Sequence, residues 1–123
     1  MIELLVVIAV IGVLATIVLV SLSAVQDRAK DTRMKASLSQ IRSIAEMAAT
    51  PLGNYADVCV AITADAVYKD LTAMNLDASP FCDDDNAGWC VHATLNNGET
   101  WCVDREKVAQ GSCGGTPAIT CAP

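Results

Sequence analysis

The sequence has few of the side chains on which catalytic and metal sites depend. It holds one histidine, His92, and only five aromatic residues, and no two cysteines show the two-residue spacing of most zinc sites. No serine, thiol or pair of carboxylates is linked to His92 by a recognisable motif of nucleophilic or acid–base catalysis. We therefore expect no enzyme activity, no cofactor and no metal centre, and we interpret His92 as a strand residue.

Positive charge is scarce over most of the chain, whose net charge is -6. Glu3 is the only charged residue among the first 25, and from Pro51 onward ten acids face three bases. The stretch 26–50 is the exception, because it sets five bases against three acids. These bases are Arg28, Lys30, Arg33, Lys35 and Arg42. Such a stretch is typical of a solvated helix face beside a membrane, and the acidic remainder gives no indication of nucleic-acid binding.

Residues 1–25, the apolar half of the N-terminal region, lack almost all polarity. The run from Leu4 to Val20 reads LLVVIAVIGVLATIVLV, and its continuation to Val25 adds two serines as the only polar residues. As a helix, these 17 to 22 residues would be about 25 to 33 Å long, close to the roughly 30 Å hydrocarbon core of a bilayer. We expect this half to sit in a membrane. A cleaved secretory signal fits less well, because the run is long and an amphipathic pattern follows it without a break.

Proline is absent from the first 50 residues, which indicates one long helix with Gly12 as its only weak point and an end at Thr50–Asn54. Residues 26–50 form its amphipathic half. Apolar side chains at spacings of four, three, four and three residues place one stripe on one face of this half. They are Met34, Leu38, Ile41, Ala45 and Ala48. We expect this stripe to pack against a globular head formed by residues 51–123.

Cysteine is missing from the first 58 residues, and all six lie in the head. They are Cys59, Cys82, Cys90, Cys102, Cys113 and Cys121. An even number in a small acidic domain predicts three disulfides and an oxidising compartment, with zinc binding as the competing interpretation. Of the fifteen possible pairings we predict the three that join sequence neighbours: Cys59 with Cys82, Cys90 with Cys102, and Cys113 with Cys121.

The clearest strand signal spans residues 88–104 and predicts a hairpin. A three-residue loop Asn96–Gly98, with Gly98 left-handed, would set Val91 opposite Val103 and Ala93 opposite Trp101. These four residues, together with Trp89 and Leu95, share an apolar face that fits the helix stripe. Cys90, His92 and Cys102 lie on the other face. A five-residue loop would change the pairing without changing the faces.

The rest of the head gives weaker signals. We expect a loop with a short extended piece over 54–62, a helix capped by Thr63 and ending near Asn75, and a loop over 77–88. That loop contains DDDNAG, which overlaps the start of a calcium site at Asp83 and Asp85, although the full calcium-loop pattern fails. We interpret it as a solvated acidic loop. The tail from Gln110 to Pro123 would depend on its cysteines for order.

The segment IELLVVIAVIGVLATI at residues 2–17 resembles the N-terminal segment of type IV pilins and of the related pseudopilins of type II secretion. The resemblance implies an α+β fold in which a long helix packs on a small antiparallel sheet. It also implies a leader removed by a prepilin peptidase, a methylated N-terminus and a pilus assembly machinery. Met1, Ile2 and Glu3 match the last three residues of the usual mature start, so we expect that two residues and the leader precede this sequence.

Glu3 is the residue on which the resemblance bears most directly. A carboxylate beside an apolar helix is costly unless it is neutral or paired, and in a filament its natural partner is a neighbour's terminal amine. The alternative is that Glu3 simply lies at a membrane interface. The further residues predicted to mediate assembly form the apolar surface and a strip of small side chains. They are Leu4, Leu5, Ile8, Ala9, Gly12 and Thr16.

Three functions remain open from the sequence. The first is the major subunit of an extracellular pilus-like filament, held in the inner membrane before assembly and then polymerised with identical subunits through the apolar half. The second is a pseudopilin of a secretion system, and the third is a monomeric membrane-anchored binding module with an exposed patch on its head. The N-terminal resemblance covers the first two, and abundant, long filaments on the cell would favour the first over the second.

Overall fold

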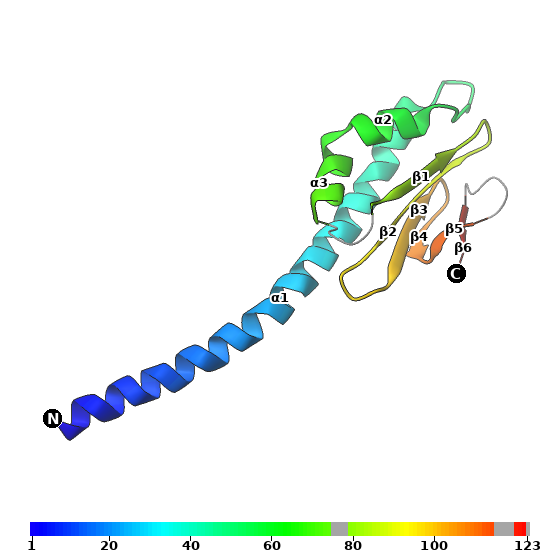
Figure 1. The fold of residues 1–123 in the computed structure, drawn as a ribbon. Coiled ribbons are helices and arrows are strands. Elements are labelled where there is room, and N and C mark those ends of the chain that lie inside the picture. The colour runs from blue at the N-terminus through cyan, green and yellow to red at the C-terminus, as the bar shows by residue number, and fades with distance from the viewer. Residues whose placement is uncertain (75–78, 115–119, 123) are drawn as a thin grey trace.

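The computed structural model describes residues 1–74, 79–114 and 120–122. One helix, α1 (Ile2–Ala48), contains 47 of these residues. Its N-terminal part projects away from the head, whereas its C-terminal part packs on it (Figure 1). The head contains α2 (Val58–Ala64), α3 (Ala66–Met74), a four-stranded sheet and a two-stranded sheet. The predicted α+β architecture, a long helix packed on a small antiparallel sheet with three disulfides, is confirmed.

The helix α1 ends where proline and glycine were expected to stop it. Ala49 leaves the helical conformation while its N–H still donates to the Ala45 carbonyl. The chain then turns sharply, because the Thr50 N–H donates to the Asn54 carbonyl and Gly53 adopts a φ of 75°. This turn sends the chain back along α1 into the head.

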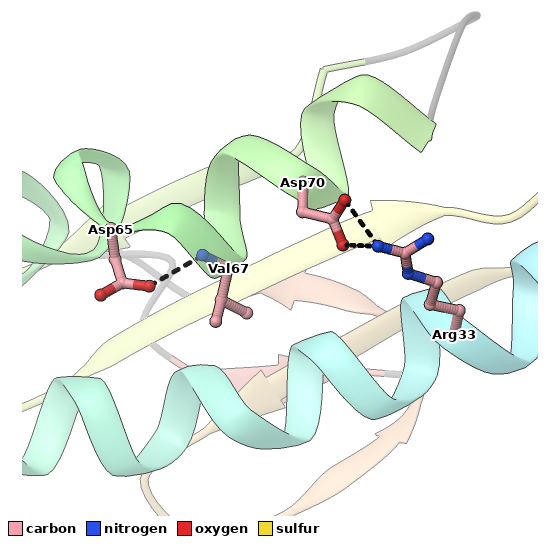
Figure 2. Close-up of polar contacts among 4 residues, drawn as sticks. All are labelled: Arg33, Asp65, Val67 and Asp70. Carbon is pink, nitrogen blue, oxygen red and sulfur yellow. Dashed lines mark hydrogen bonds and ion pairs between the residues drawn. The ribbon is translucent and has the colours of Figure 1, made fainter.

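The segment between this turn and Met74 differs from the prediction, because it forms two short helices. The expected loop over 54–62 is wrong: Val58 and Ile62, four residues apart, are buried against α1 as one face of α2. Thr63 is not a cap but lies inside α2, where its hydroxyl donates to the Cys59 carbonyl. Asp65 takes the capping role instead, since its carboxylate accepts the Val67 N–H at the start of α3. Figure 2 shows this contact.

The four-stranded sheet is antiparallel in the order β1–β2–β3–β4. Its strands are β1 (Phe81–Asp84), β2 (Trp89–Thr94), β3 (Thr100–Asp104) and β4 (Val108–Gln110). The predicted hairpin register is confirmed, with Val91 paired to Val103 and Ala93 to Trp101. The turn closes as expected, since the Leu95 N–H donates to the Glu99 carbonyl and Gly98 has a φ of 83°. The expected loop over 77–88 is wrong where β1 lies.

The main core forms where the stripe of α1 meets the apolar face of the sheet. Four of the five residues of the predicted stripe are fully buried there, and the partly buried Trp101 packs against this core. The buried helix residues are Met34, Leu38, Ile41 and Ala45, and their sheet partners include Trp89, Val91, Ala93 and Val103. Ala48 is the exception, because it is exposed. It is the last residue of α1, and Ala49 and Tyr55, beyond the helix end, contact the core in its place.

A second, smaller sheet covers the other face of the hairpin. It consists of β5 (Ser112–Gly114) and β6 (Thr120–Ala122), with Cys113 directly opposite Cys121. The disulfides join the two sheets: Cys90 bonds to Cys113, and Cys102 bonds to Cys121. The predicted pairs Cys90–Cys102 and Cys113–Cys121 are therefore wrong, although Cys59–Cys82 is confirmed. The cysteines that neighbour one another within each sheet point instead toward the sheet opposite.

Buried polar groups reinforce this second layer. Asp104, which is 3% exposed, accepts the N–H groups of Glu106 and Lys107 at one oxygen and that of Cys121 at the other, each at 2.7 Å. His92 accepts the Cys113 N–H at Nδ1 over 3.2 Å and stacks on Phe81. Burial lowers the pKa of His92, because the charged ring is poorly solvated there. The small sheet is thus held by disulfides and hydrogen bonds more than by apolar packing.

Candidate assembly surface on the apolar helix

The apolar half of α1 has no cover within the chain. Every residue from Met1 to Lys30 is exposed, including large aliphatic side chains such as Leu4 at 72% and Leu19 at 70%. Figure 1 shows this part of the helix standing clear of the head. Aliphatic surface contributes about 25 cal/mol per Å² when it leaves water, so such a helix requires lipid or other helices around it. Within the described residues, α1 is the single helix long and apolar enough to cross a membrane.

Glu3 lies in the first turn of α1 and is exposed with its aliphatic neighbours Leu4, Leu5 and Ile8. The first turn is where a carboxylate benefits from the helix dipole. In the part of the chain that the structure describes, Glu3 has no ion-pair partner. Its charge is therefore left for an external partner, either solvent or another molecule.

The small-residue strip leaves open space on one side of the helix. A methyl group added at Gly12 would meet no atom within 4 Å. Thr16 turns its hydroxyl onto the helix itself, donating to the Val13 carbonyl over 2.7 Å, so it presents its methyl group outward. Ala9 lies one turn away on the same side. Within the described residues, Gly12 has no neighbour that requires it to be small.

Three polar contacts join this helix to the head beside the buried core. Arg33 donates to both carboxylate oxygens of Asp70 on α3, at 2.9 and 2.7 Å (Figure 2). The ammonium group of Lys35 lies 4.2 Å from the centre of the Trp101 ring. Arg42 donates to the main-chain carbonyl of Arg105 at the far end of the sheet. These bases were predicted to form a solvated face; Arg33 is exposed and Lys35 and Arg42 are partly exposed, and each also has a partner in the head.

Asp31 makes a buried contact with the head that was not predicted from the sequence. Its side chain is 8% exposed, and its Oδ1 accepts both the main-chain and the side-chain N–H of Asn96 at 2.8 Å. The contact ties the hairpin turn to α1 only six residues beyond the apolar half. A signal was present, because Asp31 precedes Met34 by three residues and so lies on the same face as the buried stripe.

The candidate calcium ligands, Asp83 and Asp85, lie at the end of the sheet away from the hairpin turn. Asp83 belongs to β1, and Asp85 accepts the N–H groups of Ala87 and Gly88. The neighbouring Asp84 accepts the Cys59 N–H at the start of α2 over 3.0 Å. Within the described ranges, no three metal-ligating side chains come together. The acidic side chains of this loop thus serve the main chain around them.

Comparisons of the chain with protein-family models, with curated proteins and with solved structures return no match. The arrangement itself defines a class: a disulfide-bonded α+β head carried on a long helix whose apolar half is exposed. A membrane anchor or a signal sequence has an N-terminal helix of this length and composition.

Proposed function

We propose that this chain is the structural subunit of an extracellular, type IV pilus-like helical filament and polymerises through its apolar half. The observation that carries the proposal is the exposed apolar surface of α1 on an otherwise folded, disulfide-bonded protein. A signal sequence needs no rigid connection to the mature protein. Here the same unbroken helix continues into the core of the head, which favours a permanent anchor over a removed signal.

Assembly would exchange lipid for protein around this helix. Lipid tails are as apolar as leucine, so burial alone does not favour helix association inside a membrane. Close packing at Ala9, Gly12 and Thr16 and pairing of Glu3 with a neighbour's terminal amine provide what lipid lacks. The three disulfides then keep the exported head folded in an oxidising environment.

The test compares Glu3→Ala with Asp27→Ala in cells that express the chain. Both changes remove an exposed carboxylate from α1, but only the first lies in the apolar half. Breaking a desolvated charge pair costs about 3 to 5 kcal/mol, so we expect Glu3→Ala to reduce filament yield at least about tenfold while Asp27→Ala leaves it unchanged. Electron microscopy of sheared surface material measures the yield, and tryptophan fluorescence confirms that each head is folded.

The alternatives give different outcomes in the same experiment. Normal filaments from Glu3→Ala would contradict the pairing. Short polymers confined to the cell envelope would indicate a secretion pseudopilin, and a wild-type chain that stays monomeric in purified membranes would indicate an anchored binding module.

A further inference from the structure

The two bases nearest the apolar half, Arg28 and Lys30, differ from the three that follow, because no polar contact joins them to the head in the part of the chain that the structure describes. Arg33, Lys35 and Arg42 each contact the head. Arg28 and Lys30 are exposed, and within the described residues neither forms an ion pair. We call these two residues the basic pair. They are the only bases of the amphipathic half that take no part in holding the head.

We propose that the basic pair binds the phosphate groups of anionic phospholipids while the chain is in the membrane. This inference rests on the membrane-inserted precursor of the proposed function but not on the filament. Leu4 to Val25 spans about 33 Å as a helix, which fills a hydrocarbon core of about 30 Å. Arg28 then lies about 4.5 Å and Lys30 about 7.5 Å beyond Val25 along the axis. The headgroup layer is about 5 to 8 Å deep on each side, so both cations fall within it.

Among the described residues, the acids around the basic pair leave its charge largely uncompensated. Asp27 is the one exposed acid beside it on α1. Asp31 is buried with its carboxylate on Asn96, and Asp70 is engaged by Arg33. Two long flexible cations therefore stand at headgroup depth beside one exposed carboxylate of the part of the chain that the structure describes. Long basic side chains near the end of a membrane helix extend toward phosphates at this depth.

The surface beside Lys30 places an apolar wall next to a cation. A groove runs between α1 and α3 and is lined by Ala29, Lys30, Arg33, Ala73 and Met74. Lys30 supplies an electrostatic contact for phosphate, because Arg33 is engaged by Asp70, and the alanines and Met74 supply an apolar wall. The apolar surface of α1 begins one turn below, at Val25, where acyl chains would continue along the helix.

Spin-labelled lipids test the inference on the full chain in phosphatidylcholine vesicles. Electron paramagnetic resonance separates lipid that contacts the protein from free lipid, for labelled phosphatidylglycerol and labelled phosphatidylcholine in turn. A basic residue near a lipid surface contributes about 1 kcal/mol, so we expect the wild type to prefer phosphatidylglycerol by about fivefold or more. The double variant Arg28→Gln, Lys30→Gln should reduce this preference to less than about twofold. Lys107→Gln, an exposed lysine on the far turn of the sheet, should not change it.

Equal association of the two lipids with the wild type, or an unchanged preference in the double variant, would overturn the inference. A loss of preference in Lys107→Gln as large as in the double variant would also overturn it, by showing that total charge decides. If the double variant keeps its lipid preference but no longer forms filaments, the basic pair contacts another subunit instead. A wild type that restricts neither lipid would refute membrane insertion itself, which is a failure of the proposed function and not of this site.

Discussion

Replacing Ile41 with aspartate tests the packing of α1 on the head most directly. Ile41 is fully buried in the main core. Removing a buried isoleucine side chain to alanine costs about 2 to 5 kcal/mol, and an unpaired buried charge adds about 3 to 5 kcal/mol. The sum approaches the entire stability of about 5 to 15 kcal/mol that a domain has. We therefore expect Ile41→Asp to unfold the core, and Ile41→Ala to lower the urea midpoint by roughly 1 to 2.5 M.

The matched control is Ser39→Asp, two residues away on the exposed side of the same helix. Surface substitutions usually change stability by less than about 0.5 kcal/mol, so its midpoint should equal that of the wild type. Arg42→Asp is a poor control, because Arg42 donates to the Arg105 carbonyl. The assay is urea unfolding of the chain in a mild detergent with disulfides intact, followed by the fluorescence of the two tryptophans, which lie in or against the core. Equal midpoints for Ile41→Asp and Ser39→Asp would refute the packing.

Three further outcomes can be measured on the same material. Peptide mapping without reduction should recover Cys90 linked to Cys113, and a peptide linking Cys90 to any other cysteine would contradict the two-sheet arrangement. Because burial lowers the pKa of His92, the neutral ring is favoured in the folded state. The contribution of His92 to the free energy of unfolding should therefore be fully present above the unfolded pKa of about 6.5, and it should be lost as the pH falls through the lowered folded pKa. His92→Gln should weaken this decline in urea midpoints measured from pH 7.5 to 5, and parallel curves would refute it. Asp104→Asn should lower the free energy of unfolding by about 1 to 3 kcal/mol, because an amide N–H would replace an acceptor oxygen near the Cys121 N–H or the turn. Faster hydrogen exchange at the Cys121 amide would show that its hydrogen bond is lost, and unchanged exchange would count against Asp104 as its acceptor.

The hairpin and the stripe were predictable because their patterns are long and consistent. Alternation over Trp89–Leu95 and Trp101–Val103, joined by a glycine turn, allows few registers that bury one face. The stripe of α1 repeats over three turns, so a single misplaced member, Ala48, did not change the result. Patterns of this length outweigh local exceptions.

The helices and strands that were missed depend on contacts that the local sequence does not contain. The sequence of α2, VCVAITA, is rich in β-branched residues that favour strands, but Val58 and Ile62 are buried as one helical face against α1. β1 contains two aspartates, which are unusual in strands, and it is placed by its pairing with β2 and by the disulfide from Cys59. The strands β4, β5 and β6 have three residues each, too few to show a period.

The disulfide pairing could not be derived because it depends on the small sheet. Neighbouring cysteines on a hairpin face form an obvious candidate pair when nothing else lies above them. Once β5 and β6 cover that face, each cysteine of the hairpin meets one from the layer above. The number of disulfides followed from composition, whereas their pairing required the tertiary structure.

The disulfides also determine how the molecule transmits mechanical force. All three lie between Cys59 and Cys121, so α1 has no cross-link to the head except the backbone that leaves its C-terminal end. Tension applied to the apolar half is parallel to the helix axis and acts in shear on the whole row of core contacts from Met34 to Ala45 at once. Contacts loaded together share the force, whereas contacts peeled in sequence break one at a time. The head would keep its covalent framework under a pull strong enough to slide the helix, so such a molecule yields first at the boundary between helix and sheet.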